Sequence, residues 1–192
     1  MRLFDEEVPR TNRSGADWEH HRKARQPYGG PALDEVGVLA MSSFVLARST
    51  DVSVAVRGIT AHSDGVLLHV VVLFADEQRR EQLDWSLQEY SRSPGRFRLG
   101  VELPDGVRAT TGAGDAPPPA SPSAGALLTL LHSVSSGPLR WQGDYWLWPL
   151  PGEGSMVVGC SWPDRGIGES LVAIDTASLR AAAEKCGPVW ED

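Results

Sequence analysis

Four large aromatic side chains gather within eight residues, in the segment Trp141-Gln-Gly-Asp-Tyr-Trp-Leu-Trp148. In an extended strand, side chains alternate between two faces. One face carries Trp141, Tyr145 and Leu147, and the other carries Arg140, Gln142, Asp144, Trp146 and Trp148. Only one face can be core, and two exposed indoles would form an apolar patch of roughly 400 Å², which a soluble monomer seldom leaves unused. The second face therefore supplies the candidate binding residues: Arg140, Asp144, Trp146 and Trp148.

These aromatic rings have two interpretations. Trp is highly buried on average, so cover by a loop, a helix or a second subunit is favoured. The functional alternative is an exposed platform on which sugars or bases stack, with Trp146 and Trp148 about 7 Å apart along the strand.

Nucleophilic catalysis is the second chemistry to consider. It needs a Ser, Thr or Cys within hydrogen-bond reach of a base, and His69 and His132 are the bases that we nominate. Neither lies in a nucleophile elbow, and Gly159-Cys-Ser-Trp-Pro163 lacks the second glycine of that motif. We therefore predict no catalytic residue and keep a hydrolase as an alternative.

No cofactor or metal site is predicted. Cys160 and Cys186 are too few and too far apart for a zinc site or a disulfide framework, so both are expected to be free thiols. Asp164 and Glu169 supply two carboxylates, whereas hard cations need several converging oxygens. Gly112-Ala-Gly114 lacks the remaining parts of a dinucleotide fingerprint.

In one segment, large and small side chains alternate. Met156, Val158, Cys160 and Trp162 alternate with Ser155, Gly159 and Ser161 over residues 155–162. Small residues on one face permit close approach, which indicates either a ligand groove or tight packing against neighbouring Trp residues.

Charge and composition restrict the partners. The formal net charge of -7 argues against nucleic-acid binding, which needs a concentrated basic face. No apolar run approaches the roughly 20 residues of a membrane span, and the start resembles no signal peptide, so we expect a cytoplasmic protein without membrane contact. Residues 1–34 lack apolar periodicity and are expected to form a disordered arm. The basic patch His20 to Arg25 within it could dock an acidic partner or be a solvated charge run.

From Val36 on, short apolar runs separated by turns predict a single domain over residues 35–192. We expect strands near 37–48, 52–62, 66–75, 96–103, 107–111, 127–134, 139–148, 155–162 and 170–174. A helix is expected within 76–92, a second helix is expected to start at Asp175 and carry Trp190 back over it, and 112–125 is expected to be a flexible Gly/Pro-rich crossover. This order predicts a mainly antiparallel β-sandwich of immunoglobulin-like architecture with one C-terminal helix.

In the hairpin between the second and third strands, the length of the loop decides which side chains share a face. A three-residue loop, Ser63-Asp-Gly65, with Gly65 in the left-handed region would pair residue 62 with residue 66. That register gathers Val52, Val54 and Val56 on the face of Leu68, Val70, Val72 and Phe74, and it places Arg57 and His69 on the other.

The segments Asp144-Tyr-Trp-Leu-Trp-Pro-Leu-Pro151, Trp162-Pro163 and Gly166-Ile167 resemble those of a family of uncharacterised proteins common in actinobacteria. The resemblance covers roughly residues 36–190 and implies a shared domain, with no activity attached to it. Our first functional hypothesis is a non-enzymatic binding or assembly module that uses its aromatic sheet face to contact a protein partner or a second copy of itself. The alternatives are a small-ligand or carbohydrate-binding β-sandwich and a hydrolase.

Overall fold

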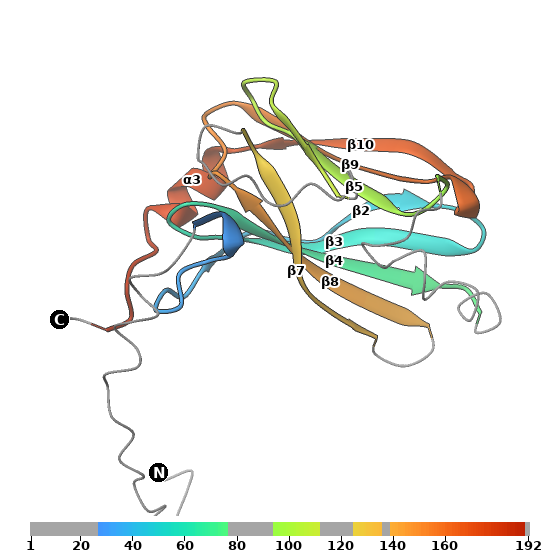
Figure 1. Cartoon of the computed structure of the whole chain (residues 1–192), viewed down its shortest axis with the longest axis horizontal. Helices are drawn as coiled ribbons and strands as arrows, with labels where there is room; N and C mark the ends of the chain where they lie inside the picture. The colour runs from blue at the N-terminus through green and yellow to red at the C-terminus, as the bar shows by residue number, and fades with distance from the viewer. Residues whose placement is uncertain (1–26, 77–93, 112–124, 136–138, 191–192) are drawn as a thin grey trace, which may run out of the picture.

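The computed structural model describes residues 27–76, 94–111, 125–135 and 139–190. Two antiparallel sheets pack face to face without closing into a barrel, and one α-helix of the described residues follows them, so the predicted β-sandwich is confirmed (Figure 1). The basic patch His20 to Arg25 lies outside the described residues. So do nearly all residues of the predicted helix at 76–92 and of the crossover at 112–125.

The first sheet has the order β1-β3-β4-β8-β7, and β2 also pairs with β3. Its strands are β1 (Val38–Met41), β2 (Phe44–Arg48), β3 (Val52–Ala61), β4 (Val66–Phe74), β7 (Leu127–Ser135) and β8 (Arg140–Trp148). The single strand predicted over 37–48 is interrupted at Ser42 and Ser43, and the two halves pair with different parts of β3.

The second sheet has the order β10-β9-β5-β6. Its strands are β5 (Arg98–Glu102), β6 (Arg108–Thr110), β9 (Ser155–Trp162) and β10 (Ile167–Asp175). The short 3-10 helix η3 (Pro163–Arg165) joins β9 to β10, and a second one, η1 (Pro27–Gly29), lies against β8. The turn Pro104-Asp-Gly106 joins β5 to β6 as predicted, with Gly106 at φ +84°.

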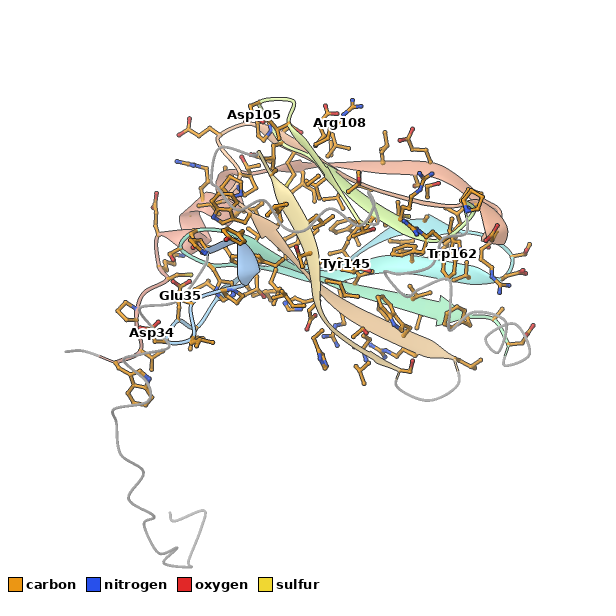
Figure 2. All side chains as sticks on the ribbon, in the orientation of Figure 1. Asp34, Glu35, Asp105, Arg108, Tyr145 and Trp162 are labelled. Carbon is orange, nitrogen blue, oxygen red and sulfur yellow. The ribbon has the colours of Figure 1, made fainter. Side chains whose placement is uncertain are left out.

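The core fills the space between the two sheets, because each strand alternates apolar side chains toward the other layer. Tyr145 and Trp162 lie in this core between the sheets (Figure 2). Trp162 is fully buried and meets the rings of Phe74 and Phe97 edge-on, at centroid distances of 6.4 and 5.4 Å. These contacts tie β4 of the first sheet to β9 of the second and to the residue that precedes β5.

The hairpin of β3 and β4 has the predicted facing but not the predicted register. Ala61 pairs with Val66, and the His62 amide donates to the Gly65 carbonyl, so the loop is two residues long and Gly65 has no positive φ. A β-bulge between Val56 and Gly58 adds one residue to β3, and this returns the side chains before the bulge to the predicted faces. The extra residue of that bulge is what a count along the sequence misses.

Helix α3 (Ala177–Ala183) packs across one end of the sandwich against β1 and β3. Leu179, Ala182 and Ala183 are buried, and the Ala177 amide donates to the Asp175 carboxylate. The expectation that Trp190 folds back over this helix is wrong, since 69% of its surface is exposed.

Candidate functional site

All four predicted binding residues lie on β8 and point away from the core. Trp141, Tyr145 and Leu147 of the same strand belong to the core, so the predicted alternation is confirmed. The four do not share one environment, because residues 27–35 cover only one end of this outer face.

Trp146 is fully buried by the chain's own N-terminal segment. Its indole Nε1 donates to the Pro27 carbonyl at 2.9 Å, and its ring lies edge-on to His62 at a centroid distance of 5.6 Å. The favoured interpretation, cover by a loop, is therefore confirmed for this residue. A partner would therefore find no exposed Trp146 on this subunit, and contact of the aromatic sheet face with a protein partner or a second copy stays a prediction.

Trp148 is half-buried. Tyr28 in η1 meets its ring edge-on at a centroid distance of 6.2 Å. Residues 27–34 therefore pack on the domain, although the sequence placed them in a disordered arm. The aromatic rings Trp146 and Trp148 decide this, because they offer apolar area that offsets the entropy of ordering a short segment.

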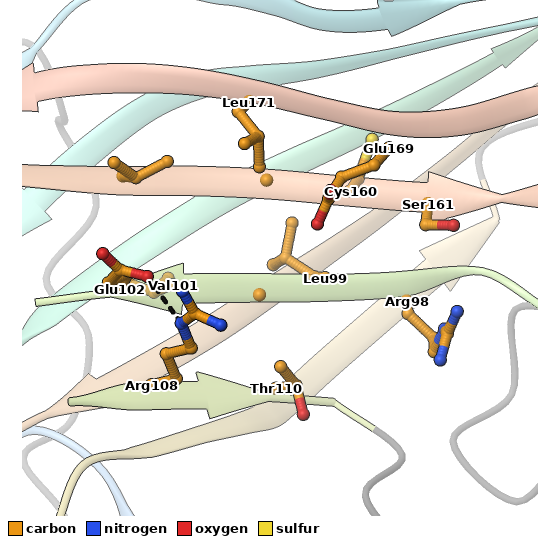
Figure 3. Close-up of a pocket in the computed structure, with 13 residues that line it drawn as sticks. Arg98, Leu99, Val101, Glu102, Arg108, Thr110, Cys160, Ser161, Glu169 and Leu171 are labelled. Carbon is orange, nitrogen blue, oxygen red and sulfur yellow. Dashed lines mark hydrogen bonds and ion pairs between the residues drawn. The ribbon is translucent and has the colours of Figure 1, made fainter. Parts of the chain in front are cut away.

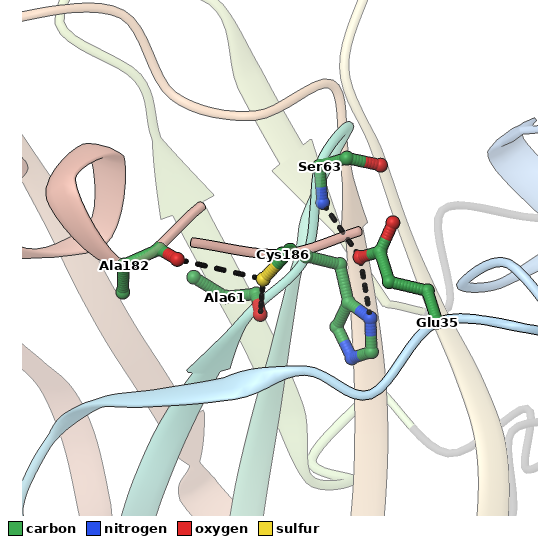
Figure 4. A network of polar contacts seen from close by, with 6 residues as sticks. Glu35, Ala61, Ser63, Ala182 and Cys186 are labelled. Carbon is green, nitrogen blue, oxygen red and sulfur yellow. Dashed lines mark hydrogen bonds and ion pairs between the residues drawn. The ribbon is translucent and has the colours of Figure 1, made fainter. Parts of the chain in front are cut away.

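Glu35 fastens the end of this segment. One of its carboxylate oxygens accepts from the Ser63 amide at 2.8 Å and lies 3.2 Å from His62 Nδ1 (Figure 4). The side chains of Glu35 and His62 are almost completely buried, at 6% and 7% exposure respectively. The Val189 amide donates to the Asp34 carbonyl, so the C-terminal segment also holds the cover in place.

Asp144 lies beside the covered area and takes part in a row of three polar side chains, which we call the relay. His69 is its direct neighbour on β4, and the distance from Asp144 Oδ1 to His69 Nδ1 is 2.8 Å. On the other side of the ring, Nε2 lies 2.8 Å from Thr60 Oγ1 on β3. The His69 side chain is 22% exposed and that of Asp144 is 35% exposed, so the relay borders solvent.

The relay has the connectivity of a hydroxyl nucleophile, a base and an orienting carboxylate. A carboxylate on Nδ1 fixes the tautomer that carries the proton there, which leaves Nε2 to accept from the Thr60 hydroxyl. The nominated base His69 is thus within reach of a hydroxyl. However, Thr60, His69 and Asp144 lie on strands paired on both sides, which commits their amides to the ladder instead of to an oxyanion.

Arg140 and His132 lie on the open part of the same face. His132 is the cross-strand neighbour of Asp144 and is exposed. Arg140 pairs with Leu73 in register, and its buried Nε has no hydrogen-bond partner among the described residues. Sequence proximity on β8 therefore does not bring Arg140 and Trp146 into one site.

A groove on the outer face of the second sheet is the other candidate. It has a volume of about 590 Å³, within the usual range for small-ligand pockets (Figure 3). Gly100 on β5 pairs directly with Gly159 on β9, so two adjacent positions of the sheet carry no side chain. The floor is backbone at Gly100 with Thr110 on one side, while the Leu171 side chain lies over Gly159, which is buried.

Two further rows of residues bound this floor. At one end, Glu102 and Arg108 are cross-strand neighbours and form an ion pair. At the other end, Arg98 and Glu169 both pair in register with Ser161, which separates them. None of the described residues that line the groove is aromatic.

The two cysteines are not activated nucleophiles. Burial raises the pKa of Cys160 from 9.0 to about 12. Burial also raises the pKa of Cys186, whose thiol donates to the Ala61 and Ala182 carbonyls (Figure 4). Both sulfurs are unpaired, as the sequence predicts.

No group of three or more His, Cys, Asp or Glu side chains is placed to hold a metal ion in ranges 27–76, 94–111, 125–135 and 139–190. In the same ranges no helix has the length and apolarity required to cross a membrane.

The sequence indicated one half of the groove. The alternation of Gly159 and Ser161 with large residues marked β9 as the source of a small-residue face. Gly100 gave no such indication, because only the pairing of β5 with β9 sets it opposite Gly159. The relay was missed for the same reason, since Thr60, His69 and Asp144 come from three strands.

Compared with protein-family models, with curated proteins and with solved structures, the chain shows no match. The resemblance to an actinobacterial family therefore stays a prediction.

Proposed function

We propose that this protein is a small-ligand-binding module and that the groove on the outer face of the second sheet is its binding site. The paired glycines Gly100 and Gly159 are the observation that carries this proposal. Glycine in a strand interior weakens the strand, so two of them side by side are expected where another molecule approaches the backbone closely.

The composition of the groove favours a small organic ligand over a sugar. Sugar sites stack their ligand on aromatic rings, and the lining of this groove contains none among the residues that the structure describes. Leu171 is 60% exposed and Val157 is half-buried, which gives the ligand apolar contacts beside a few charged groups. Apolar walls with a small number of polar groups are the usual composition of a ligand site.

The test uses a variant that fills the floor. A Cβ at Gly100 would lie 3.2 Å from the Thr110 methyl, so Gly100→Val fits with a small shift and occupies the groove. Ligands found by screening metabolites with protein-observed NMR should shift signals of β5 and β9, and Gly100→Val should abolish their binding. Gly168→Val is the matched control, because nothing lies within 4 Å of a Cβ at that position of the same sheet. Binding that survives Gly100→Val would place the site elsewhere.

A second function is favoured by the relay: transfer of an acyl group from an ester to Thr60 and then to water. Thr60 Oγ1 would attack the ester carbonyl carbon while its proton moves to His69 Nε2, and the departing alcohol would take that proton. Water would then release the acid by the same route. This function ranks second because the relay lacks free amides to stabilise the oxyanion.

The acyl-transfer function is tested with p-nitrophenyl acetate. Hydrolysis above the background rate should be lost in Thr60→Val and retained in part in Thr60→Ser. If the wild type and Thr60→Val release nitrophenol equally fast, the relay is a structural hydrogen-bond network.

A further inference from the structure

We propose that the ligand of the groove is a short zwitterion, such as a small peptide, whose carboxylate binds Arg98 and whose ammonium binds Glu169. This inference rests on the proposed function and adds the chemical class of the ligand.

Each end of the groove carries one arginine and one glutamate, but the two ends arrange them differently. At one end, Glu102 and Arg108 occupy adjacent strands and pair with each other. At the other end, Ser161 lies between Arg98 and Glu169, and neither of these two side chains has an ion pair or hydrogen bond in the described part of the chain (Figure 3). One end is thus internally neutralised, and the other presents a separate cation and anion.

The spacing sets the size of the ligand. Two strand spacings separate the Arg98 and Glu169 backbones by about 10 Å. Flexible side chains can shorten this span, so a molecule with its two charges several bonds apart can meet both. Arg98 offers a planar guanidinium that binds a carboxylate through two parallel hydrogen bonds, whereas Glu169 can accept only from a donor such as an ammonium.

The uncharged part of the ligand has a defined place. Gly100 and Gly159 form the row next to Arg98 and Ser161, and the Leu171 side chain lies over Gly159, where a Cβ would be only 2.5 Å from its methyl group. The Gly100 backbone beside the exposed Leu171 side chain suits an apolar body of small cross-section. Longer peptides with bulky side chains would meet Leu171 and Thr110.

The experiment measures binding of four forms of trialanine by isothermal titration and NMR: the free peptide, the N-acetylated peptide, the C-amidated peptide and the doubly blocked peptide. The free peptide should bind most tightly. Removal of either charge should weaken binding about tenfold, the usual effect of losing one charge-assisted hydrogen-bonded contact.

Two variants make the test specific. Arg98→Ala should weaken the free peptide about tenfold and leave the C-amidated peptide unchanged. Arg57→Ala is the matched control, since Arg57 is an exposed arginine of β3 in the other sheet and does not line the groove, and it should change binding less than about threefold. Ser161→Glu places a carboxylate directly beside Arg98 and should remove its selectivity for the free carboxylate.

The outcomes separate this inference from the proposed function. Equal binding of all four peptides, abolished by Gly100→Val, overturns the zwitterion and retains the groove as a site. Absence of peptide binding, while other screened compounds bind and are lost in Gly100→Val, has the same meaning. If no compound gives binding that depends on Gly100, both proposals fail.

Discussion

Glu35 is the residue on which the cover of the aromatic face depends. Its carboxylate serves the Ser63 amide and the buried His62 ring together. Truncation leaves the Ser63 amide and the His62 ring without this partner, and the ring lies where water reaches poorly and where an unmade hydrogen bond is costly.

We therefore expect Glu35→Ala to lower the free energy of unfolding by about 1–3 kcal/mol in urea titrations. Glu153→Ala is the control, because Glu153 is exposed on the chain between β8 and β9. An equal effect of the two substitutions would show that the carboxylate of Glu35 does not hold the cover.

Cys160 gives a prediction about pH. Its pKa is raised to about 12 in the folded protein, so the thiol is protonated where an unfolded cysteine ionises near 9.0. The neutral thiol therefore stabilises the fold fully below about pH 9, and this contribution is lost as the pH rises toward 12. The stability of Cys160→Ala should fall less steeply over this interval than that of the wild type.

The same residue can be tested chemically. Because the thiolate is the nucleophile, Cys160 in the folded protein should react with Ellman's reagent at least about a hundredfold more slowly than in urea at pH 8. Fast labelling of Cys160 without denaturant would contradict its burial.

At the scale of elements, the segment from η1 to Glu35 acts as part of the sandwich. It completes the hydrogen bonding of Trp146 and covers a sheet face that would otherwise expose indole. A chain that begins at Gly37 should therefore lose on the order of 3 kcal/mol of stability, as expected for exposing much of a Trp side chain. Its Trp fluorescence should shift to the red.

A chain that begins at Pro27 is the matched control for this truncation, since it keeps the contacts that residues 27–35 make with the aromatic face. If the chain beginning at Gly37 shows the fluorescence and stability of this control, Trp146 finds its burial without the segment.

Tight packing around Gly143 of β8 gives a second prediction at the scale of elements. A Cβ at Gly143 would lie 2.3 Å from the Trp141 ring and 3.0 Å from Leu130, inside the core. Gly143→Ala should destabilise the protein by about 1–3 kcal/mol, the usual cost of overpacking. Gly152→Ala, where a Cβ meets nothing within 4 Å, should be close to neutral in the same thermal unfolding assay.

For the whole molecule, one core connects both sheets and helix α3. A single core predicts cooperative unfolding, so far-UV circular dichroism and Trp fluorescence should give coincident urea transitions. Trp162, which contacts Phe74 of the first sheet and Phe97 next to β5, is the reporter that both layers share. Separate transitions would mean that the two sheets unfold independently.

The sequence by itself determined which side chains face inward. Alternation along Phe97, Leu99 and Val101, and along Trp141, Tyr145 and Leu147, fixed the core faces and with them the β-sandwich, because a strand's side-chain period is two whatever its partners are. Helix α3 and the β5–β6 turn were equally local and therefore predictable.

Only the tertiary structure decided which strands lie side by side and what covers them. The pairing of Gly100 with Gly159 makes the groove, and the adjacency of β3, β4 and β8 brings Thr60, His69 and Asp144 together. The burial of Trp146 under Pro27 joins residues 119 positions apart. Such contacts depend on strand order and on bulges between distant segments, and neither leaves a periodic pattern along a single chain.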